Sequence, residues 1–109
     1  MTDEEVREIV RLQACDGLTT VNDHRTALKQ ALVPPQAIFV LDRTAKDGLV
    51  TDREQKVWLV GQENSSDGYK IIMRDDGLQF GLASPGFPAD KYPILCGWYG
   101  SLTSAFLGM

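Results

Sequence analysis

Residues 69–84, YKIIMRDDGLQFGLAS, carry the clearest structural signal in the chain: two apolar-rich runs on either side of Asp76-Gly77. Asp-Gly is a preferred pair for the turn of a β-hairpin. With a two-residue turn there, Met73 lies opposite Phe80, and sliding the pairing by one residue would send the apolar set to solvent. The stretch therefore predicts a hairpin of fixed register. The face expected to be buried carries Tyr69, Ile71, Met73, Phe80 and Leu82.

Ile72 and Gly81 fall on the other face of this hairpin, which is more polar because it also carries Lys70, Arg74 and Gln79. A large aliphatic side chain in such a position is costly to leave in water. We therefore expect another part of the chain to cover Ile72 and Gly81 at least in part.

Three further segments have the apolar, β-branched and aromatic composition of strands. They are AIFVLD (37–42), KVWLVGQ (56–62) and ILCGW (94–98). The first is apolar enough to be buried on both faces. Between the first two, the polar residues 43–55 predict a connecting segment with its turn at Lys46-Asp47-Gly48, and ENSSDG (63–68) predicts a loop. Residues 84–93 contain three prolines and predict a constrained loop, not a regular strand.

The N-terminal part predicts a helical hairpin. Thr2 followed by Glu5 forms the capping-box pattern at the start of one helix. A second helix is expected from about Val21 to Val33, since Pro34 and Pro35 would stop it. The short connection between the two helices favours antiparallel packing of one on the other.

Eighteen uncharged residues follow Lys91, the last charged side chain in the chain. A membrane-spanning helix needs about 20 predominantly apolar residues, and this stretch is interrupted by glycines, serines and Pro93. We expect it to fold inward as a last, central strand and a short helix capped by Ser101. The expected fold is thus one α+β domain over residues 1–109: an N-terminal helical hairpin packed on an antiparallel sheet of four to five strands, with a short C-terminal helix.

The net charge of −4, from 15 acidic and 11 basic residues, argues against binding to nucleic acid, which requires Lys and Arg to neutralise phosphates. It also disfavours a DNA-binding reading of the two helices. An acidic surface favours a basic protein partner. The acidic N-terminus MTDEEVRE does not have the pattern of a signal peptide. We therefore expect a cytoplasmic protein in which Cys15 and Cys96 are reduced thiols.

No motif predicts catalysis, a metal site or a cofactor. His24 is the single histidine, and the spacing of Cys15 and Cys96 fits no zinc pattern. An alternative hypothesis is a small-ligand-binding protein or enzyme with a pocket near His24 and the aromatic loop 84–99. Another alternative is a structural homo-oligomer that associates through the uncharged C-terminal segment.

The leading hypothesis is a small acidic, non-enzymatic protein-binding module, of the inhibitor or immunity-protein type, that docks as a monomer or homodimer on a basic protein. The interacting side chains are expected to be acids clustered near one turn and aromatic residues near the proline-rich loop, because Tyr and Trp are enriched at interface hot spots. The predicted partner-binding residues are Asp42, Asp47, Asp52, Glu54, Phe87, Tyr92 and Trp98.

Overall fold

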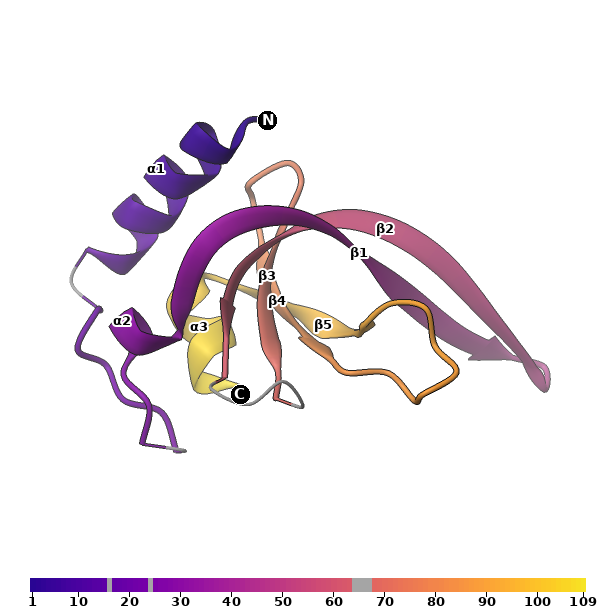
Figure 1. The fold of residues 1–109 in the computed structure, drawn as a ribbon. Helices are drawn as coiled ribbons and strands as arrows, with labels where there is room; N and C mark the ends of the chain where they lie inside the picture. The colour runs from indigo at the N-terminus through magenta and orange to yellow at the C-terminus, as the bar shows by residue number, and fades with distance from the viewer. Residues whose placement is uncertain (16, 24, 64–67) are drawn as a thin grey trace.

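A computed structural model describes residues 1–15, 17–23, 25–63 and 68–109 of the chain. Five strands, adjacent in the order β1-β2-β3-β4-β5, close into a small barrel, and the helices lie at one end of the molecule (Figure 1). The elements are α1 (Asp3–Ala14), α2 (Leu28–Ala31), β1 (Leu32–Lys46), β2 (Leu49–Gln62), β3 (Lys70–Arg74), β4 (Phe80–Ser84), β5 (Ile94–Gly100) and α3 (Leu102–Leu107).

This architecture confirms mixed α and β content, a five-stranded sheet and a short C-terminal helix. The sheet differs from the prediction in being closed. β5 pairs antiparallel with β4 but meets β1 in parallel, where Leu41 lies opposite Ile94. Closure depends on contacts between segments far apart in the chain, so no local pattern in the sequence indicates it.

The β3–β4 hairpin has the predicted register: Met73 lies opposite Phe80 and Ile71 opposite Leu82. Its turn is wider than the predicted two residues. Arg74 and Gln79 close the ladder through a backbone hydrogen bond of 2.8 Å, which leaves residues 75–78 as the connection. Gly77 takes a φ of 75° there, the left-handed conformation that glycine adopts at little cost.

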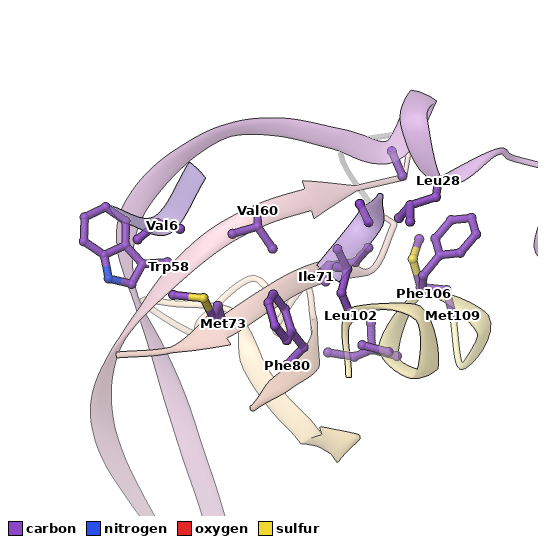
Figure 2. Close-up of a cluster of buried hydrophobic side chains, with 14 residues drawn as sticks. Val6, Leu28, Trp58, Val60, Ile71, Met73, Phe80, Leu102, Phe106 and Met109 are labelled. Atoms are coloured by element: carbon purple, nitrogen blue, oxygen red, sulfur yellow. The ribbon is translucent and has the colours of Figure 1, made fainter. Parts of the chain in front are cut away.

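Two apolar clusters lie on the two faces of the sheet. The larger one fills the space between the sheet and the helices, and Figure 2 shows Ile71 and Phe80 on the side of Phe106 and Leu102, with Met73 nearer to Trp58. The smaller cluster combines Val40, Val57, Ile72 and Ala83 with the partly buried Ile38, Leu95 and Trp98. Because all five strands contribute to the smaller cluster, it forms the interior of the barrel.

The expected cover over Ile72 and Gly81 is confirmed, and Trp98 provides much of it. A Cβ atom added to Gly81 would stand 2.7 Å from Cε3 of Trp98 and 2.3 Å from the carbonyl oxygen of Gly97. Glycine is therefore required in β4 for the close approach of β5.

The predicted starts of the N-terminal and the C-terminal helix are confirmed. The Thr2 side chain accepts a hydrogen bond from the backbone N–H of Glu5, and the Glu5 side chain accepts one from the N–H of Thr2. Ser101 accepts from the N–H of Ser104 at the start of α3. The uncharged C-terminus folds inward, as predicted, with Phe106 fully buried. β5 itself is only partly buried.

The predicted second helix is wrong over most of its length. Only the single turn of α2 is helical, which is too short to form the second helix of a helical hairpin. Upstream of it, the Asn22 side chain accepts from the N–H of Thr26 at 3.1 Å, and Val21 pairs with Ala27 in an isolated bridge. Asn and Thr side chains offer the backbone such local alternatives to helical hydrogen bonds.

The two prolines that were expected to end that helix lie instead near the start of β1. The pairing of β1 with β2 is irregular between Leu32 and Gln36, where proline has no N–H to donate to the ladder. Two other expectations for this region also need correction. Residues 37–42 are not buried on both faces, because Ala37 and Phe39 are exposed. Residues 43–55 are mostly strand and not a loop.

Among the described residues, no helix combines the length and apolarity that crossing a bilayer requires. His24 and most of the predicted loop 63–68 lie outside the described residues.

Candidate functional site

The β1–β2 hairpin extends well beyond the barrel. β3 pairs with β2 only from Val57 onward, and β5 meets β1 at Leu41. In the described chain, residues 42–53 are consequently paired only with one another, from Asp42 opposite Arg53 to Lys46 opposite Leu49. We call this two-stranded extension the arm. Figure 1 shows it projecting as a narrow ribbon away from the helices.

The tip of the arm combines a tight turn with exposed apolar side chains. Asp47 and Gly48 both have positive φ, at 52° and 78°, which is the requirement of the type I′ turn that matches the twist of a hairpin. Leu49 and Val50 follow directly and are 71% and 66% exposed. Residues 42–53 pair with one another and belong to neither apolar cluster, so the arm adds no side chain to the core.

The loop of residues 85–93 is attached to the base of the arm through Arg43. The guanidinium of Arg43 donates to both carboxylate oxygens of Asp52, at 2.7 and 2.8 Å, and its Nη2 donates to Asp90 Oδ1 at 2.7 Å. Bidentate pairs of this kind fix geometry as well as adding attraction. These hydrogen bonds raise the pKa of Arg43 and lower the pKa of Asp52 and of Asp90 below the ordinary aspartate value.

Other contacts complete the docking of the loop. The rings of Phe39 and Tyr92 lie 5.6 Å apart between centroids, and the N–H of Leu41 donates to the carbonyl of Pro93 at 2.8 Å. Lys91 Nζ lies 3.9 Å from Glu54 Oε1. The loop is thus held by ionic, aromatic and backbone contacts to one side of the hairpin.

Asp90 also orders the loop internally, because its Oδ2 accepts from the N–H of Phe87 at 2.8 Å. The Phe87 side chain nevertheless points into solvent and is 76% exposed. We call the arm together with residues 85–93 the arm–loop surface. It presents three well-exposed apolar side chains, those of Leu49, Val50 and Phe87, on segments held by specific hydrogen bonds.

The predicted partner-binding residues are distributed unevenly over this surface. Asp42 lies opposite Arg53 in the arm and Asp47 lies at its tip, while Asp52 is engaged by Arg43. Tyr92 is partly buried against Phe39. Six of the seven predicted residues therefore lie on the arm, at its base or in the loop: Asp42, Asp47, Asp52, Glu54, Phe87 and Tyr92.

Trp98 does not belong with them. It is partly buried in the barrel interior against Gly81, where its contribution is to packing. The neighbouring Tyr99 is the exposed member of the pair, but it lies near Gly108 on the side of α3. We therefore leave both residues out of the arm–loop surface.

The arm is locally neutral. Its three acids are balanced by three bases, and the pairing of Arg43 with Asp52 and Asp90 removes much of the negative potential that the sequence suggested. The charged residues of the arm are Asp42, Asp47 and Asp52 against Arg43, Lys46 and Arg53.

Leu49 and Val50 were missed as candidate interaction residues. The signal that would have found them is Asp47-Gly48, the same turn dipeptide that identified the β3–β4 hairpin. Taking residues 43–55 as two strands around that turn places Leu49 and Val50 at its exposed end. Asp90 was missed for a different reason, since its partner Arg43 is 47 residues away in the chain.

A hollow of about 430 Å³ lies beside the loop, lined by Arg43, Ser84, Pro85, Gly86, Phe87 and Ile94. Its ionisable group, Arg43, is committed to two carboxylates. Within the described part of the chain, no three His, Cys, Asp or Glu side chains come together as potential metal ligands. Cys15 and Cys96 are both exposed free thiols. The predicted pocket near His24 lies outside the described residues.

No protein-family model matches the sequence, and neither a curated protein nor a solved structure shows significant similarity to the chain.

Proposed function

We propose that the protein is a non-enzymatic protein-binding module that docks on a basic protein partner through the arm–loop surface. The observation that carries this proposal is the arm: a ribbon of residues 42–53 that lies outside the barrel and ends in the exposed side chains of Leu49 and Val50. Apolar side chains at the end of a projecting ribbon are costly in water and are buried when a partner covers them.

The attachment of the loop supports the same interpretation. Phe87 is exposed, yet the backbone beneath it is tied to Asp90 and, through Asp90, to Arg43. An aromatic side chain on an ordered backbone loses less conformational entropy on binding than one on a free loop. Phe87 therefore has the properties of an interface anchor.

The net negative charge of the protein acts on the proposed partner at long range. The net charge of −4 attracts a basic protein and speeds encounter, whereas the locally neutral arm favours close contact through apolar side chains. Desolvating the apolar residues then provides affinity without the cost of burying unpaired charges. Apolar substitutions on the arm–loop surface should therefore change the affinity, whereas charge-changing substitutions should change the rate of association.

We propose that the protein acts as an inhibitor or immunity-type protein by inserting the arm into a cleft that the partner needs for its own activity. A narrow two-stranded projection has a suitable shape for such a cleft. The gene neighbourhood tests this part separately, because an immunity-type protein is expected beside the gene of its toxin.

The principal test compares three variants in affinity capture from the native host, followed by measurement of Kd with the captured protein. Leu49→Ser with Val50→Ser, and Phe87→Ser, should each weaken binding at least about tenfold, since hot-spot truncations cost about 2 kcal/mol or more. Leu78→Ser is the matched control, because Leu78 is 74% exposed but lies at the β3–β4 turn. Equal binding by all three variants would rule out the arm–loop surface.

A second test distinguishes long-range electrostatic attraction from apolar contact in the complex. Charge reversal at Asp42 and Asp47 leaves the contacts of Arg43 and of Lys91 in place and should slow association and flatten its salt dependence, with little change in the dissociation rate. An association rate that does not respond to these changes contradicts the basic-partner part of the proposal. That result would not bear on the apolar side chains of the arm–loop surface, which the first test examines.

A further inference from the structure

A groove of about 590 Å³ lies between α1 and the first residues of β1, away from the arm–loop surface. Its volume falls within the range of about 300–1,000 Å³ that is typical of small-ligand sites. The lining is largely apolar. From α1 and the turn after it come Val10, Ala14 and Leu18, and from the start of β1 come Leu32, Val33 and Pro35.

Among the described residues that line the groove, the two charged side chains, Arg7 and Arg11, are both basic, although the protein as a whole is acidic. Arg11 donates to Glu8 through Nε and Nη2, which leaves its Nη1 for another acceptor. Arg7 also lines the groove, and none of the ion pairs found in the described part of the chain involves it. An apolar groove with an available guanidinium is complementary to an apolar ligand that carries one negative charge.

We propose that this groove binds a medium-chain carboxylate, with its alkyl chain along the apolar lining and its carboxylate on Arg7. A carboxylate matches the planar donor pair of a guanidinium. A neutral alkyl ligand would gain no charge attraction to Arg7, and a cationic one would be repelled by both arginines. The proposal is independent of the partner-binding function, because α1 and the arm lie at opposite ends of the molecule (Figure 1).

The chain contains its own reporter for this site. Cys15 lines the groove and is exposed, whereas Cys96 is exposed on β5 and is not among the lining residues. The rates at which a small thiol reagent modifies the two cysteines can be followed separately by peptide mass spectrometry. Decanoate, kept below the concentration at which it forms micelles, should slow modification of Cys15 and leave Cys96 unchanged.

The specificity of the site is tested with matched ligands and variants. Decanol and decylamine should protect Cys15 much less than decanoate does. Arg7→Gln should weaken decanoate binding, measured by calorimetry, about tenfold, the effect of losing one charge-assisted contact. Arg53→Gln makes the same charge change on the arm and should leave decanoate binding unchanged.

Three results would overturn the proposal: no protection of Cys15 by decanoate, equal protection by decanol, or unchanged decanoate affinity in the Arg7→Gln variant. Protection by an acidic amphipathic peptide but not by decanoate would also overturn it, because the groove would then be a peptide site. Since none of these measurements uses the protein partner, their failure leaves the arm–loop surface untouched.

Discussion

Arg43 connects more of the molecule than any other charged residue of the arm–loop surface. It joins the two strands of the arm through Asp52 and fixes the loop of residues 85–93 through Asp90. Its position in β1 also places it at the point where β1 leaves the barrel. The arrangement of the proposed binding surface therefore depends strongly on one guanidinium and two carboxylates.

The ionisation of Asp90 should control the order of this loop. Hydrogen bonds from Arg43 and from the N–H of Phe87 lower the pKa of Asp90 below its ordinary value of 3.8. A lowered pKa in the folded state means that ionised Asp90 stabilises the docked loop above pH 3.8, and that this contribution is lost as the pH falls through the lowered pKa. The amide proton of Phe87, followed by NMR, should accordingly titrate with a midpoint below 3.8.

The same titration in Asp90→Asn provides the control, because an asparagine at this position does not ionise. The Phe87 amide signal should then lose its acidic titration, while the N–H of Leu78, which donates to Asp76, should keep it. A midpoint for Phe87 at or above 3.8 in the unaltered protein would contradict the Arg43–Asp90 contact.

The capping box at Thr2 supports a second residue-scale prediction. Thr2→Ala removes the acceptor for the N–H of Glu5 and should lower the free energy of unfolding by about 1 kcal/mol. Thr2→Ser keeps a hydroxyl acceptor and should change it by only a few tenths of that. Urea unfolding of the three proteins checks both values, and equal losses for alanine and serine would show that the hydroxyl has no capping role.

At the scale of elements, the contact between β4 and β5 depends on the absence of a side chain at Gly81. Gly81→Ala would place a Cβ atom within 2.3 Å of the Gly97 carbonyl oxygen, so the strands must separate. We expect a loss of about 1–3 kcal/mol or more, as in other overpacked cores.

Gly97→Ala is the matched control in the neighbouring strand. A Cβ atom at Gly97 meets nothing within 4 Å, so the free energy of unfolding should change by less than about 0.5 kcal/mol. Chemical denaturation distinguishes the two variants. Similar stability of the two variants would be inconsistent with the tight β4–β5 contact.

Shortening the arm, in contrast to substituting Gly81, should change the stability of the protein very little. Deleting Ala45, Lys46, Leu49 and Val50 removes two cross-strand pairs, keeps the Asp47-Gly48 turn and preserves which face each remaining side chain occupies. Because the deleted residues are exposed, the free energy of unfolding should change by less than about 1 kcal/mol. Unfolding of the shortened protein would show instead that the arm supports the core.

Among the elements, those with strong local signals were predicted correctly. The register of the β3–β4 hairpin, the start of α1 and the start of α3 each depend on residues within a few positions of one another. The second helix failed because its apolar spacing competes with Asn22, Thr26 and the pairing of Val21 with Ala27. Helical propensity is weak enough for such local contacts to override it.

At the scale of the whole molecule, α3 joins the end of the chain to the core. Phe106 is fully buried in the larger cluster together with residues of β3, β4 and the other helices (Figure 2). Phe106→Ala should lower the free energy of unfolding by about 3–5 kcal/mol. Leu107→Ala, in the same helix but largely exposed, should cost much less, and thermal and urea unfolding can compare them.

The candidate site could be predicted only in part. The positions of Phe87 and of the acids near Asp47 followed from turn chemistry, because prolines and Asp-Gly pairs restrict the backbone locally. The meeting of the arm with the loop could not be predicted, since it depends on contact between Arg43 and Asp90, which are 47 positions apart in the chain. The place of Trp98 inside the barrel could not be predicted either, because alternation along a strand shows which residues share a face but not which face is inside.

The amino-acid sequence by itself determined part of each strand, the register of the β3–β4 hairpin, the caps of α1 and α3 and the inward folding of α3, because each follows from turn geometry, capping or the burial of apolar side chains. Tertiary structure decided the closure of the sheet, the projection of the arm and the partial burial of Trp98 inside the barrel. Those features arise from contacts between distant segments, whose relative positions are set only when all five strands and both clusters pack together.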